Sequence, residues 1–375
     1  MIKNLKTNSK IIIFMPSMDG GGVEKNIILI TNYLVNYYKY ISLITFNNKF
    51  KKKFSKKIHF ISHTSKNTIR SKYYKYFICL IYLFKQIIFC KKVLVFSFQA
   101  NIYALILCKF LKKKIIIRSN SAPTGWTKNL IKRKIFKFFF KYANSIIVNS
   151  KDFKKEIDKE FNINSKLIYN PLNKLEIIKN SKRKINLKFF SKNKKKFIKI
   201  INIARFTDQK DQATIIKATN ILKSKINIKL LMIGYGEYKE KLNLLVSKYK
   251  LNKNVKILGF KKNPYPYLKK SDLFILSSKY EGLPNVLLEA MTLKKFIIST
   301  DCQTGPREIL FNGKYGDLFK IGDFRMLSRL IYNFNFYKNE NKKKINLAYK
   351  SLARFDFDKN CKKYLKIINK NVLNN

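Results

Sequence analysis

The feature that most constrains the fold of this chain is a repeated alternation of short apolar runs with longer helical patterns. In the first half the apolar runs span residues 11–16, 40–46, 92–98, 114–120 and 144–150. Each run is bounded by turn residues and is too short for a core helix. Near-continuous apolar strands joined by crossover helices are typical of a parallel sheet that is covered on both faces. The pattern therefore predicts an α/β fold.

The alternation resumes after a basic stretch, "IIKNSKRKINLKFFSKNKKK" at residues 177–196, which has little packing periodicity. A helix is predicted over 211–224, with Asp211 as its N-cap. Further strands are predicted at 197–205, 228–236, 254–260, 272–278 and 295–300. A chain of 375 residues is long enough for two ordinary domains. We predict an N-terminal domain over 1–176, a C-terminal domain over 177–354, and a helix over 355–372 that crosses back to the first domain.

The formal charge of +59, from 80 basic and 21 acidic residues, predicts a surface that attracts polyanions. Nucleic acid, anionic lipid and phosphorylated substrates are the classes of partner that fit. The lysine excess is spread along the chain and is also what a compositional bias towards Lys, Asn and Ile would produce. A basic nucleic-acid-binding protein stays open as an alternative, although no zinc-finger, RRM-like or KH-like pattern occurs.

Cysteine and hydropathy patterns predict a cytoplasmic protein. The five cysteines are widely spaced and only two histidines occur, so neither a disulfide framework nor a metal site is expected. The apolar run at 11–16 is too short for a signal sequence. The run at 76–90 contains Lys85 and is shorter than the ~18–20 residues that a spanning helix needs. The segment 130–143 interleaves cations with Phe and Ile, which suits either the surface of an anionic membrane or an ordinary amphipathic helix.

Polar residues that follow the predicted strands of the second half indicate a binding site, because ligands of parallel sheets lie at the carboxyl ends of strands. Arg205 ends one strand, and Lys210 precedes the next helix. A planar guanidinium and an ammonium beside a helix N-terminus suit a diphosphate. Gly234 and Gly236 follow another strand and allow a close approach of backbone or ligand. Taken singly, these are also ordinary features of surfaces and turns.

The stretch "SSKYEGLPNVLLEAM" places Glu281 in a loop and Glu289 inside the helix that follows it. Pro284 suits the first turn of this helix, whose free N–H groups would face a phosphate. A carboxylate accepts hydrogen bonds from two adjacent hydroxyl groups, so each glutamate suits a sugar or a ribose. The stretch "STDCQTGPREIL" then forms a turn at Gly305 after the last strand of this series.

These motifs, "ARFTDQKD", "IGYGE", "EGLPNVLLEAM" and "DCQTGPREIL", occur in an order that resembles the retaining GT-B glycosyltransferases of the GT4 type. The resemblance is specific over residues 196–325 and weaker over the N-terminal half, through "PSMDGGGVEKNIILITNYL". It implies two Rossmann-like domains that face a central cleft, with the acceptor bound by the N-terminal domain and a nucleotide sugar by the C-terminal one.

The resemblance also implies roles for individual residues. Arg205 and Lys210 would hold the diphosphate of the donor and Glu281 would contact the donor sugar, and we take these three as the catalytic set. The remaining donor-binding residues expected are Gly21, Gly22, Asn120, Gly234, Gly236, Gly282, Leu283, Pro284, Asn285, Val286 and Glu289. Many relatives have a histidine where this chain has Arg118, Ser119 and Asn120. Asp19, beside the glycines, is a candidate acceptor-side carboxylate or a turn residue.

The function that the resemblance implies is transfer of a hexose or N-acetylhexosamine, with retention and without a metal or cofactor. The donor would be a nucleotide-diphosphate sugar, with UDP as the expected nucleotide. The acceptor would be a lipid-linked saccharide or a polysaccharide of the bacterial surface, such as capsule, O-antigen or lipopolysaccharide, and the enzyme would sit peripherally on the inner face of the plasma membrane. A GT-B nucleotide-sugar epimerase is a second alternative.

Overall fold

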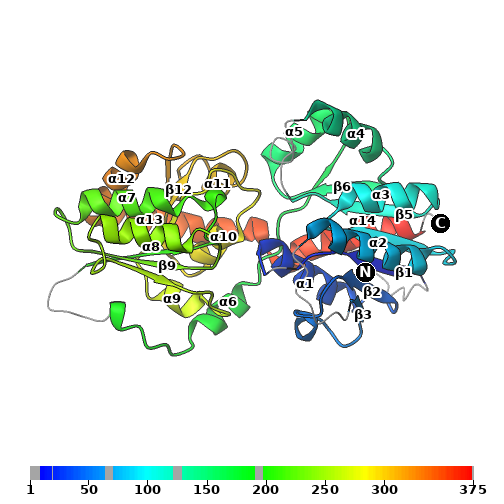
Figure 1. Cartoon of the computed structure of the whole chain (residues 1–375), viewed down its shortest axis with the longest axis horizontal. Coiled ribbons are helices and arrows are strands. Elements are labelled where there is room, and N and C mark those ends of the chain that lie inside the picture. The colour runs from blue at the N-terminus through cyan, green and yellow to red at the C-terminus, as the bar shows by residue number, and fades with distance from the viewer. Residues whose placement is uncertain (1–8, 19, 64–70, 121–128, 191–196, 374–375) are drawn as a thin grey trace. The chain divides into compact units, whose positions relative to one another are not determined.

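The computed structural model describes residues 9–18, 20–63, 71–120, 129–190 and 197–373 (Figure 1). The chain divides into two compact units. Unit 1 comprises Met1–Pro171 and Phe355–Asn375, and unit 2 comprises Leu172–Arg354. The division falls at Leu172 because helix α6 (Lys174–Ser181) packs against α9 (Tyr265–Lys269) and α10 (Asn285–Thr292), which belong to unit 2.

The described residues of unit 1 form a seven-stranded parallel sheet with the order β3-β2-β1-β4-β5-β6-β7. The strands are β1 (Lys10–Phe14), β2 (Ile41–Thr45), β3 (His59–Ser62), β4 (Val93–Ser97), β5 (Lys114–Arg118), β6 (Ser145–Val148) and β7 (Lys166–Leu167). The five strands predicted in this half are confirmed. The sequence patterns did not reveal β3 and β7, because β3 is only half-buried and β7 is two residues long.

Helices cover both faces of this sheet, which is why its strands are apolar almost throughout. They are α1 (Gly22–Leu34), α2 (Lys72–Ile87), α3 (Asn101–Phe110), α4 (Leu130–Phe140), α5 (Lys151–Phe161) and α14 (Phe357–Leu373), with a 3-10 turn at Lys51–Lys53. Alternate residues of β1 point to opposite faces. Ile11 and Ile13 pack with residues of α1 and α14, whereas Ile12 and Phe14 pack with residues of α2 and α3.

The described residues of unit 2 form a six-stranded parallel sheet with the order β10-β9-β8-β11-β12-β13. The strands are β8 (Ile198–Ile203), β9 (Ile228–Ile233), β10 (Val255–Leu258), β11 (Leu273–Leu276), β12 (Phe296–Thr300) and β13 (Asp317–Phe319). Its further helices are α7 (Gln212–Leu222), α8 (Lys239–Lys248), α11 (Pro306–Ile309), α12 (Phe324–Phe336) and α13 (Lys338–Ser351). Short 3-10 turns lie at Lys188–Phe190, Asp208–Lys210 and Leu352–Phe355.

Unit 2 confirms the predicted strands and the predicted helix over 211–224, with two local differences. Asp211 is the N-cap of α7, but its carboxylate accepts from the hydroxyl of Thr214 and makes no capping bond to the helix backbone. Pro284 was expected in the first turn of its helix and is instead the N-cap of α10, with extended backbone. The helix can start only after this residue because ψ of Pro284 is 105°, outside the helical region.

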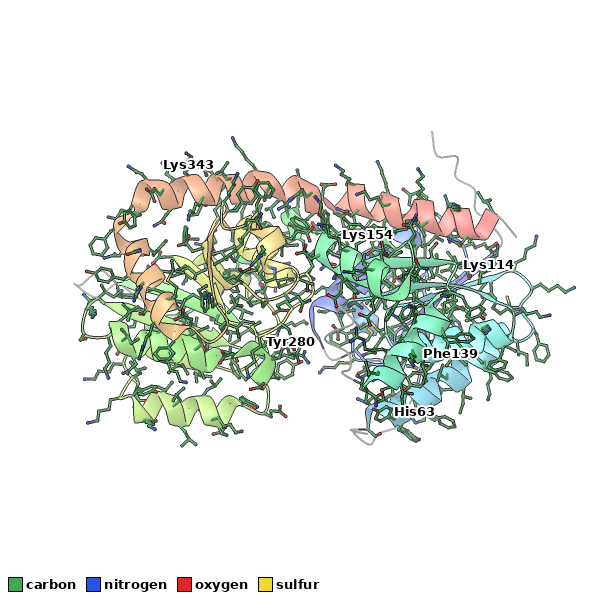
Figure 2. All side chains as sticks on the ribbon, turned by 90° about the horizontal axis from the view of Figure 1, so that it is seen from above. His63, Lys114, Phe139, Lys154, Tyr280 and Lys343 are labelled. Atoms are coloured by element: carbon green, nitrogen blue, oxygen red, sulfur yellow. The ribbon has the colours of Figure 1, made fainter. Side chains whose placement is uncertain are left out.

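The predicted C-terminal helix is confirmed as α14, which packs within unit 1 against α1 and β4. Arg118, at the end of β5, is 0% exposed and fixes this helix to the sheet. Its Nε donates to the Tyr364 hydroxyl at 2.8 Å and its Nη2 donates to Asn170 Oδ1 at 2.6 Å. At the other end of the strand, Lys114 Nζ donates to the Asn371 carbonyl at 3.2 Å (Lys114 is labelled in Figure 2).

The partners of the buried guanidinium are neutral. Besides Tyr364 and Asn170, Arg118 contacts Asn120 Oδ1 and lies 5.6 Å from the ring centre of Phe98. Burial raises the pKa of Tyr364, so its hydroxyl stays protonated and serves Arg118 as a neutral acceptor. Since no carboxylate pairs with Arg118 among the residues described, each of these hydrogen bonds carries part of the solvation that the cation has lost.

The described helices include none with the length and apolar character needed to cross a membrane.

Replacing Tyr364 with Phe tests the attachment of α14. The substitution removes only the oxygen that accepts from Arg118 Nε, and it leaves a buried, charged N–H group without a partner. We expect the free energy of unfolding of unit 1 to fall by about 1–3 kcal/mol, measured by urea denaturation. Tyr73→Phe is the matched control, because the Tyr73 side chain is 72% exposed. Equal stability of the two variants would show that this hydrogen bond does not fix the helix.

Candidate active site

The candidate site of unit 2 lies where the strand order of its sheet reverses. Strands β9 and β10 extend from one side of β8, and β11 to β13 extend from the other side. In a doubly wound sheet the loops that follow the two strands at such a point diverge and leave room for a ligand. The loop after β8 contains Arg205 and Lys210, and the loop after β11 contains Glu281. The structure therefore places three residues predicted from the sequence on the two loops beside the switch point.

An ion pair joins these two loops. Lys210 Nζ lies 2.5 Å from Glu281 Oε1. The hydroxyl of Ser278 donates to the same carboxylate oxygen at 2.7 Å. The side chains of Lys210 and Glu281 are only 15% and 9% exposed, so water screens their attraction less than it would at the surface. The pair brings a cation and a carboxylate to one place at the carboxyl edge of the sheet.

Hydrogen bonds to backbone carbonyl groups hold the same two loops together. Lys279 N donates to the Gln209 carbonyl at 2.8 Å, and Gln209 Nε2 donates to the Tyr280 carbonyl at 2.9 Å (Tyr280 is labelled in Figure 2). The hydroxyl of Ser277 donates to the Lys210 carbonyl at 2.8 Å. These bonds fix the backbone on both sides of the ion pair, so neither charged group depends on the pair alone for its position.

Glycines allow the loops after β9 and β12 to pack closely against the loops that carry the ion pair. A Cβ at Gly234 would lie 1.9 Å from the Ala204 carbonyl oxygen, and one at Gly236 would lie 2.2 Å from that of Phe206. A Cβ at Gly305 would lie 1.8 Å from the Gly282 carbonyl oxygen, and its φ of +83° is itself unfavourable for other residues. Gly234 and Gly236 therefore allow the loop after β9 to contact the backbone of the loop after β8.

The segment that follows Glu281 leads directly into α10. Gly282, Leu283 and Pro284 precede the helix, and Asn285 and Val286 are its first two residues. Within this first turn the Leu287 N–H donates to the Pro284 carbonyl at 3.1 Å. Glu289 lies at the centre of the eight-residue helix and is 4% exposed, so it is a buried carboxylate rather than a solvated one.

Arg205 is placed on the same loop as Lys210, but its side chain is exposed and makes no ion pair with a described residue. Its backbone is held by Gln212 Nε2, which donates to the Arg205 carbonyl at 2.8 Å. The backbone of Arg205 is therefore held in place, while its exposed guanidinium can bind an anion. Lys210 differs because its ammonium already pairs with Glu281.

The predicted residues of unit 1 occupy two places in that unit. Gly21 is the N-cap of α1 and Gly22 is its first residue. The Gly21 N–H donates to Glu24 Oε2 at 2.9 Å, so the chain's own carboxylate occupies part of this helix N-terminus. Asn120 accepts from Arg118 and donates to the Phe98 carbonyl at 2.9 Å. Asp19 lies outside the described residues.

Three further residues position Glu281 and were not predicted from the sequence: Ser278, Gln209 and Thr304. Thr304 Oγ1 donates to the Glu281 carbonyl at 2.5 Å, and it belongs to a motif that was interpreted only as a turn. The nearby side chain of Cys302 is 2% exposed. Its burial, and to a lesser extent the negative charge of Glu281, raises the pKa of the Cys302 thiol to about 12. The thiol is therefore held in its protonated form at neutral pH.

Replacing Gly305 with Ala tests the close approach that supports Glu281. The added Cβ would collide with the Gly282 carbonyl and would adopt an unfavourable φ, so we expect a loss of more than about 1 kcal/mol in unfolding free energy. Gly259→Ala is the matched control, because a Cβ there would meet nothing within 4 Å. Denaturation midpoints compare the two variants, and a Gly305→Ala protein as stable as the control would refute the argument.

Comparison with known proteins places the chain in a family. The sequence model of the family described as "Glycosyl transferases group 1" matches residues 183–367. An uncharacterized glycosyltransferase of Methanocaldococcus jannaschii is 32% identical over 286 residues, which cover 70% of each chain. Another from the same organism is 39% identical over 204 residues, but the chain spans only 50% of that relative's length.

A relative with a named activity is the N-acetylgalactosamine-N,N'-diacetylbacillosaminyl-diphospho-undecaprenol 4-alpha-N-acetylgalactosaminyltransferase of Campylobacter jejuni. It is 28% identical over 329 residues, or 83% of this chain and 86% of the relative. Among solved structures, Anabaena HepE in complex with UDP has a TM-score of 0.78 at 16% identity, and the match covers 96% of this chain and 100% of HepE. This likeness confirms the expected GT-B architecture of two Rossmann-like domains. By its sequence relatives and its fold, the chain belongs to the glycosyl transferases group 1 family and is a glycosyltransferase.

Proposed function

We propose that this protein transfers a hexose or N-acetylhexosamine from a UDP-sugar, with retention, to a lipid-linked saccharide or a polysaccharide in bacterial surface glycan synthesis. The observation that carries the proposal is the Lys210–Glu281 pair, 2.5 Å between Nζ and Oε1, at the switch point of unit 2. Unit 2 would bind the donor and unit 1 the acceptor. Family membership favours this function over a nucleotide-sugar epimerase or a nucleic-acid-binding protein.

The diphosphate of the donor would be held by cations and by N–H groups. Arg205 offers an exposed, planar guanidinium, and Lys210 offers a less exposed ammonium on the same loop. The first turn of α10, from Asn285, adds backbone N–H groups with the positive end of a helix dipole. These groups stabilise the negative charge that develops on the departing diphosphate, which is the electrostatic work that a transferase of this kind requires. This charge stabilisation would not depend on a metal ion.

Glu281 would orient the donor sugar. Lys210 and Ser278 both contact its Oε1. The second carboxylate oxygen, Oε2, could therefore accept from a sugar hydroxyl while the ion pair stays intact. Lys210 would then have two functions, to neutralise phosphate charge and to hold Glu281 in place. Glu289, on α10, would accept from the ribose hydroxyls of the nucleotide.

Retention would follow if the acceptor attacks from the face that the leaving group departs from. The departing phosphate would take the proton of the acceptor hydroxyl, so no separate protein base is needed. Gly21, Gly22 and Asn120 are the residues of unit 1 that we propose on the donor side. The activity named for the Campylobacter jejuni relative, on a diphospho-undecaprenol-linked saccharide, supports a lipid-linked acceptor. The UDP bound in HepE supports UDP as the donor nucleotide.

A peripheral association with anionic membranes fits the outer face of α4. Ile131, Ile135 and Phe138 are spaced by four and three residues, so they form one stripe along the helix, and they are 70%, 44% and 53% exposed. Lys134, Lys137 and Lys141 form a parallel cationic row beside this stripe. No aspartate or glutamate occurs between Glu24 and Asp152. Apolar side chains flanked by a row of exposed lysines suit insertion between anionic headgroups.

Substitutions in the ion pair test the proposed chemistry. We expect Glu281→Gln and Lys210→Ala each to lower kcat by about 10²–10³-fold. Lys210→Ala removes a cation that stabilises the departing diphosphate, and Glu281→Gln removes both the charge that holds Lys210 and the carboxylate that orients the donor sugar. We expect Arg205→Ala to raise the KM for the donor. Transfer is measured with a panel of UDP-hexoses and UDP-N-acetylhexosamines and a lipid-linked saccharide, and NMR of the product gives the anomeric configuration.

Lys279→Ala is the matched control for these variants. Lys279 lies two residues before Glu281 and pairs with Asp208, but its side chain is 40% exposed and the pair is at the surface. We expect nearly unchanged kinetics, since exposed ion pairs contribute little. Full activity of both Glu281→Gln and Lys210→Ala would overturn the site assignment, and inversion at the anomeric carbon would overturn the proposed retention.

Flotation with vesicles of phosphatidylcholine and phosphatidylglycerol tests the α4 surface. We expect the protein to float with the vesicles at low salt. The triple variant Ile131→Ser/Ile135→Ser/Phe138→Ser should bind at least about tenfold less, because each side chain contributes roughly 1 kcal/mol or more on insertion. Leu244→Ser, on α8 and 71% exposed in the parent, is the control. Equal flotation of the triple variant and the control would exclude α4 as the contact.

A further inference from the structure

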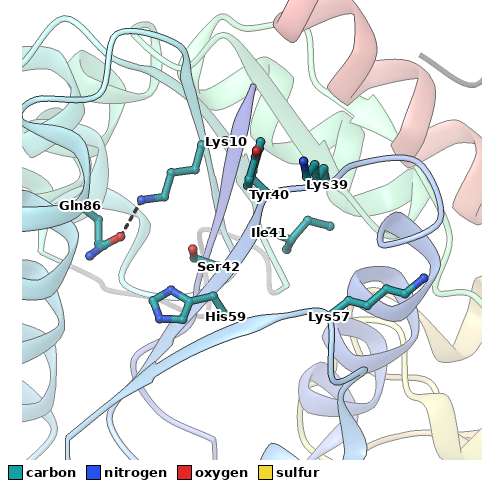
Figure 3. A pocket seen from close by; sticks show the side chains of 8 residues that line it. All are labelled: Lys10, Lys39, Tyr40, Ile41, Ser42, Lys57, His59 and Gln86. Carbon is teal, nitrogen blue, oxygen red and sulfur yellow. Dashed lines mark hydrogen bonds between the residues drawn. The ribbon is translucent and has the colours of Figure 1, made fainter. Parts of the chain in front are cut away.

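A cationic pocket lies in unit 1 at the amino ends of β1, β2 and β3 (Figure 3). This is the end of the sheet opposite to the one where ligands of parallel sheets normally bind. The pocket has a volume of about 530 Å³. Its lining residues are Lys10, Lys39, Tyr40, Ile41, Ser42, Lys57, His59 and Gln86. None of the roles assigned above uses these residues.

The sheet register explains why these groups meet. Lys10 begins β1 and points to the same face as Ile12, which packs with residues of α2. Ser42 is the register partner of Ile12, and His59 is the register partner of Ser42. Lys10, Ser42 and His59 therefore share one face of three adjacent strands. Gln86, in the last turn of α2, closes that face.

The polar groups that line the pocket are mainly hydrogen-bond donors. Lys10 Nζ donates to Gln86 Oε1 at 2.6 Å (Figure 3). This bond positions the ammonium, leaves it two more N–H groups, and leaves the amide NH₂ of Gln86 as a donor. Lys39 and Lys57 add two exposed ammonium groups, and the Tyr40 hydroxyl and the His59 ring add groups that can also donate. None of the described residues that line the pocket carries a carboxylate.

Three lysines line one cavity, which gives it a positive potential that attracts anions. The chain contains no acidic residue between Glu24 and Asp152, so the segments that supply seven of the eight lining residues bring no carboxylate to neutralise them. We propose that this pocket binds a phosphate-bearing anion, with its charge shared by Lys10, Lys39 and Lys57. The phosphate could belong to a free metabolite or to a lipid headgroup. This site is separate from the candidate active site of unit 2 and does not depend on the proposed function.

The two histidines of the chain make a local test possible, because only His59 lines the pocket. His63 lies outside it, with its Nδ1 3.1 Å from the Tyr82 hydroxyl. Histidine-selective isotope labelling gives two sets of ring resonances in NMR spectra, which the variant His63→Gln assigns. We expect inorganic pyrophosphate, added at constant ionic strength and pH, to shift the His59 resonances in a saturable manner and to leave those of His63 in place. Pyrophosphate bound at Arg205 and Lys210 in unit 2 would not produce this local signal.

Charge variants separate a defined site from a general attraction to a basic protein. We expect Lys39→Ala/Lys57→Ala to raise the dissociation constant for pyrophosphate, read at His59, by about tenfold or more. Lys155→Ala/Lys159→Ala removes the same charge from exposed positions of α5 and should leave that constant unchanged. A second titration uses a short-chain phosphatidylglycerol below its micelle concentration. A shift with pyrophosphate assigns a free phosphate compound, and a shift with the lipid alone assigns a headgroup. No saturable His59 shift with either probe, or equal affinities of the two double variants, would overturn the proposal.

Discussion

The candidate active site depends on the pairing of β8 with β11. These strands are 70 residues apart along the chain, yet Leu273 and Phe274 lie in register with Ile200 and Ile201. This pairing starts the loops after both strands from adjacent points at the carboxyl edge of the sheet. Lys210 and Glu281 can form an ion pair only because of that arrangement. The strand order, rather than any local preference of either loop, therefore determines where the cation and the carboxylate meet.

The packing around the pair shows why small residues occur at fixed positions in these loops. The carbonyl oxygens of Ala204, Phe206 and Gly282 occupy the space that a Cβ would need at Gly234, Gly236 and Gly305. The loops after β8, β9, β11 and β12 consequently support each other through backbone contacts. A site built from such contacts is already organised before a ligand arrives, which reduces the reorganisation that charge stabilisation in a transition state would require.

The sequence predicted the strands well because buried parallel strands are continuous apolar runs, and the structure confirms them with small changes at their ends. It also predicted which loops would carry the candidate site, since the carboxyl ends of parallel strands meet at one edge. It could not predict partners. The bonds from Ser278 and Thr304 to Glu281 join polar residues that look like ordinary turn residues in the sequence. The bond between Arg118 and Tyr364 joins residues 246 positions apart, and no local pattern marks it.

The position of the carboxylates along the chain says more about the positive charge of this protein than the net charge alone. In unit 2 acidic side chains pair with cations within the unit, as in Lys210–Glu281, Arg307–Asp301 and Lys344–Asp317. In unit 1 the stretch from Lys25 to Lys151 contains no acidic residue, so none of its many lysines can pair with a neighbour from the same stretch. Its buried Arg118 is solvated by neutral oxygens instead. Where a cation of this stretch pairs with a carboxylate, the carboxylate comes from outside the stretch, as Glu160 of α5 does for Arg133. The uneven placement of carboxylates along the chain, more than the net charge of +59, therefore concentrates positive charge in this part of unit 1.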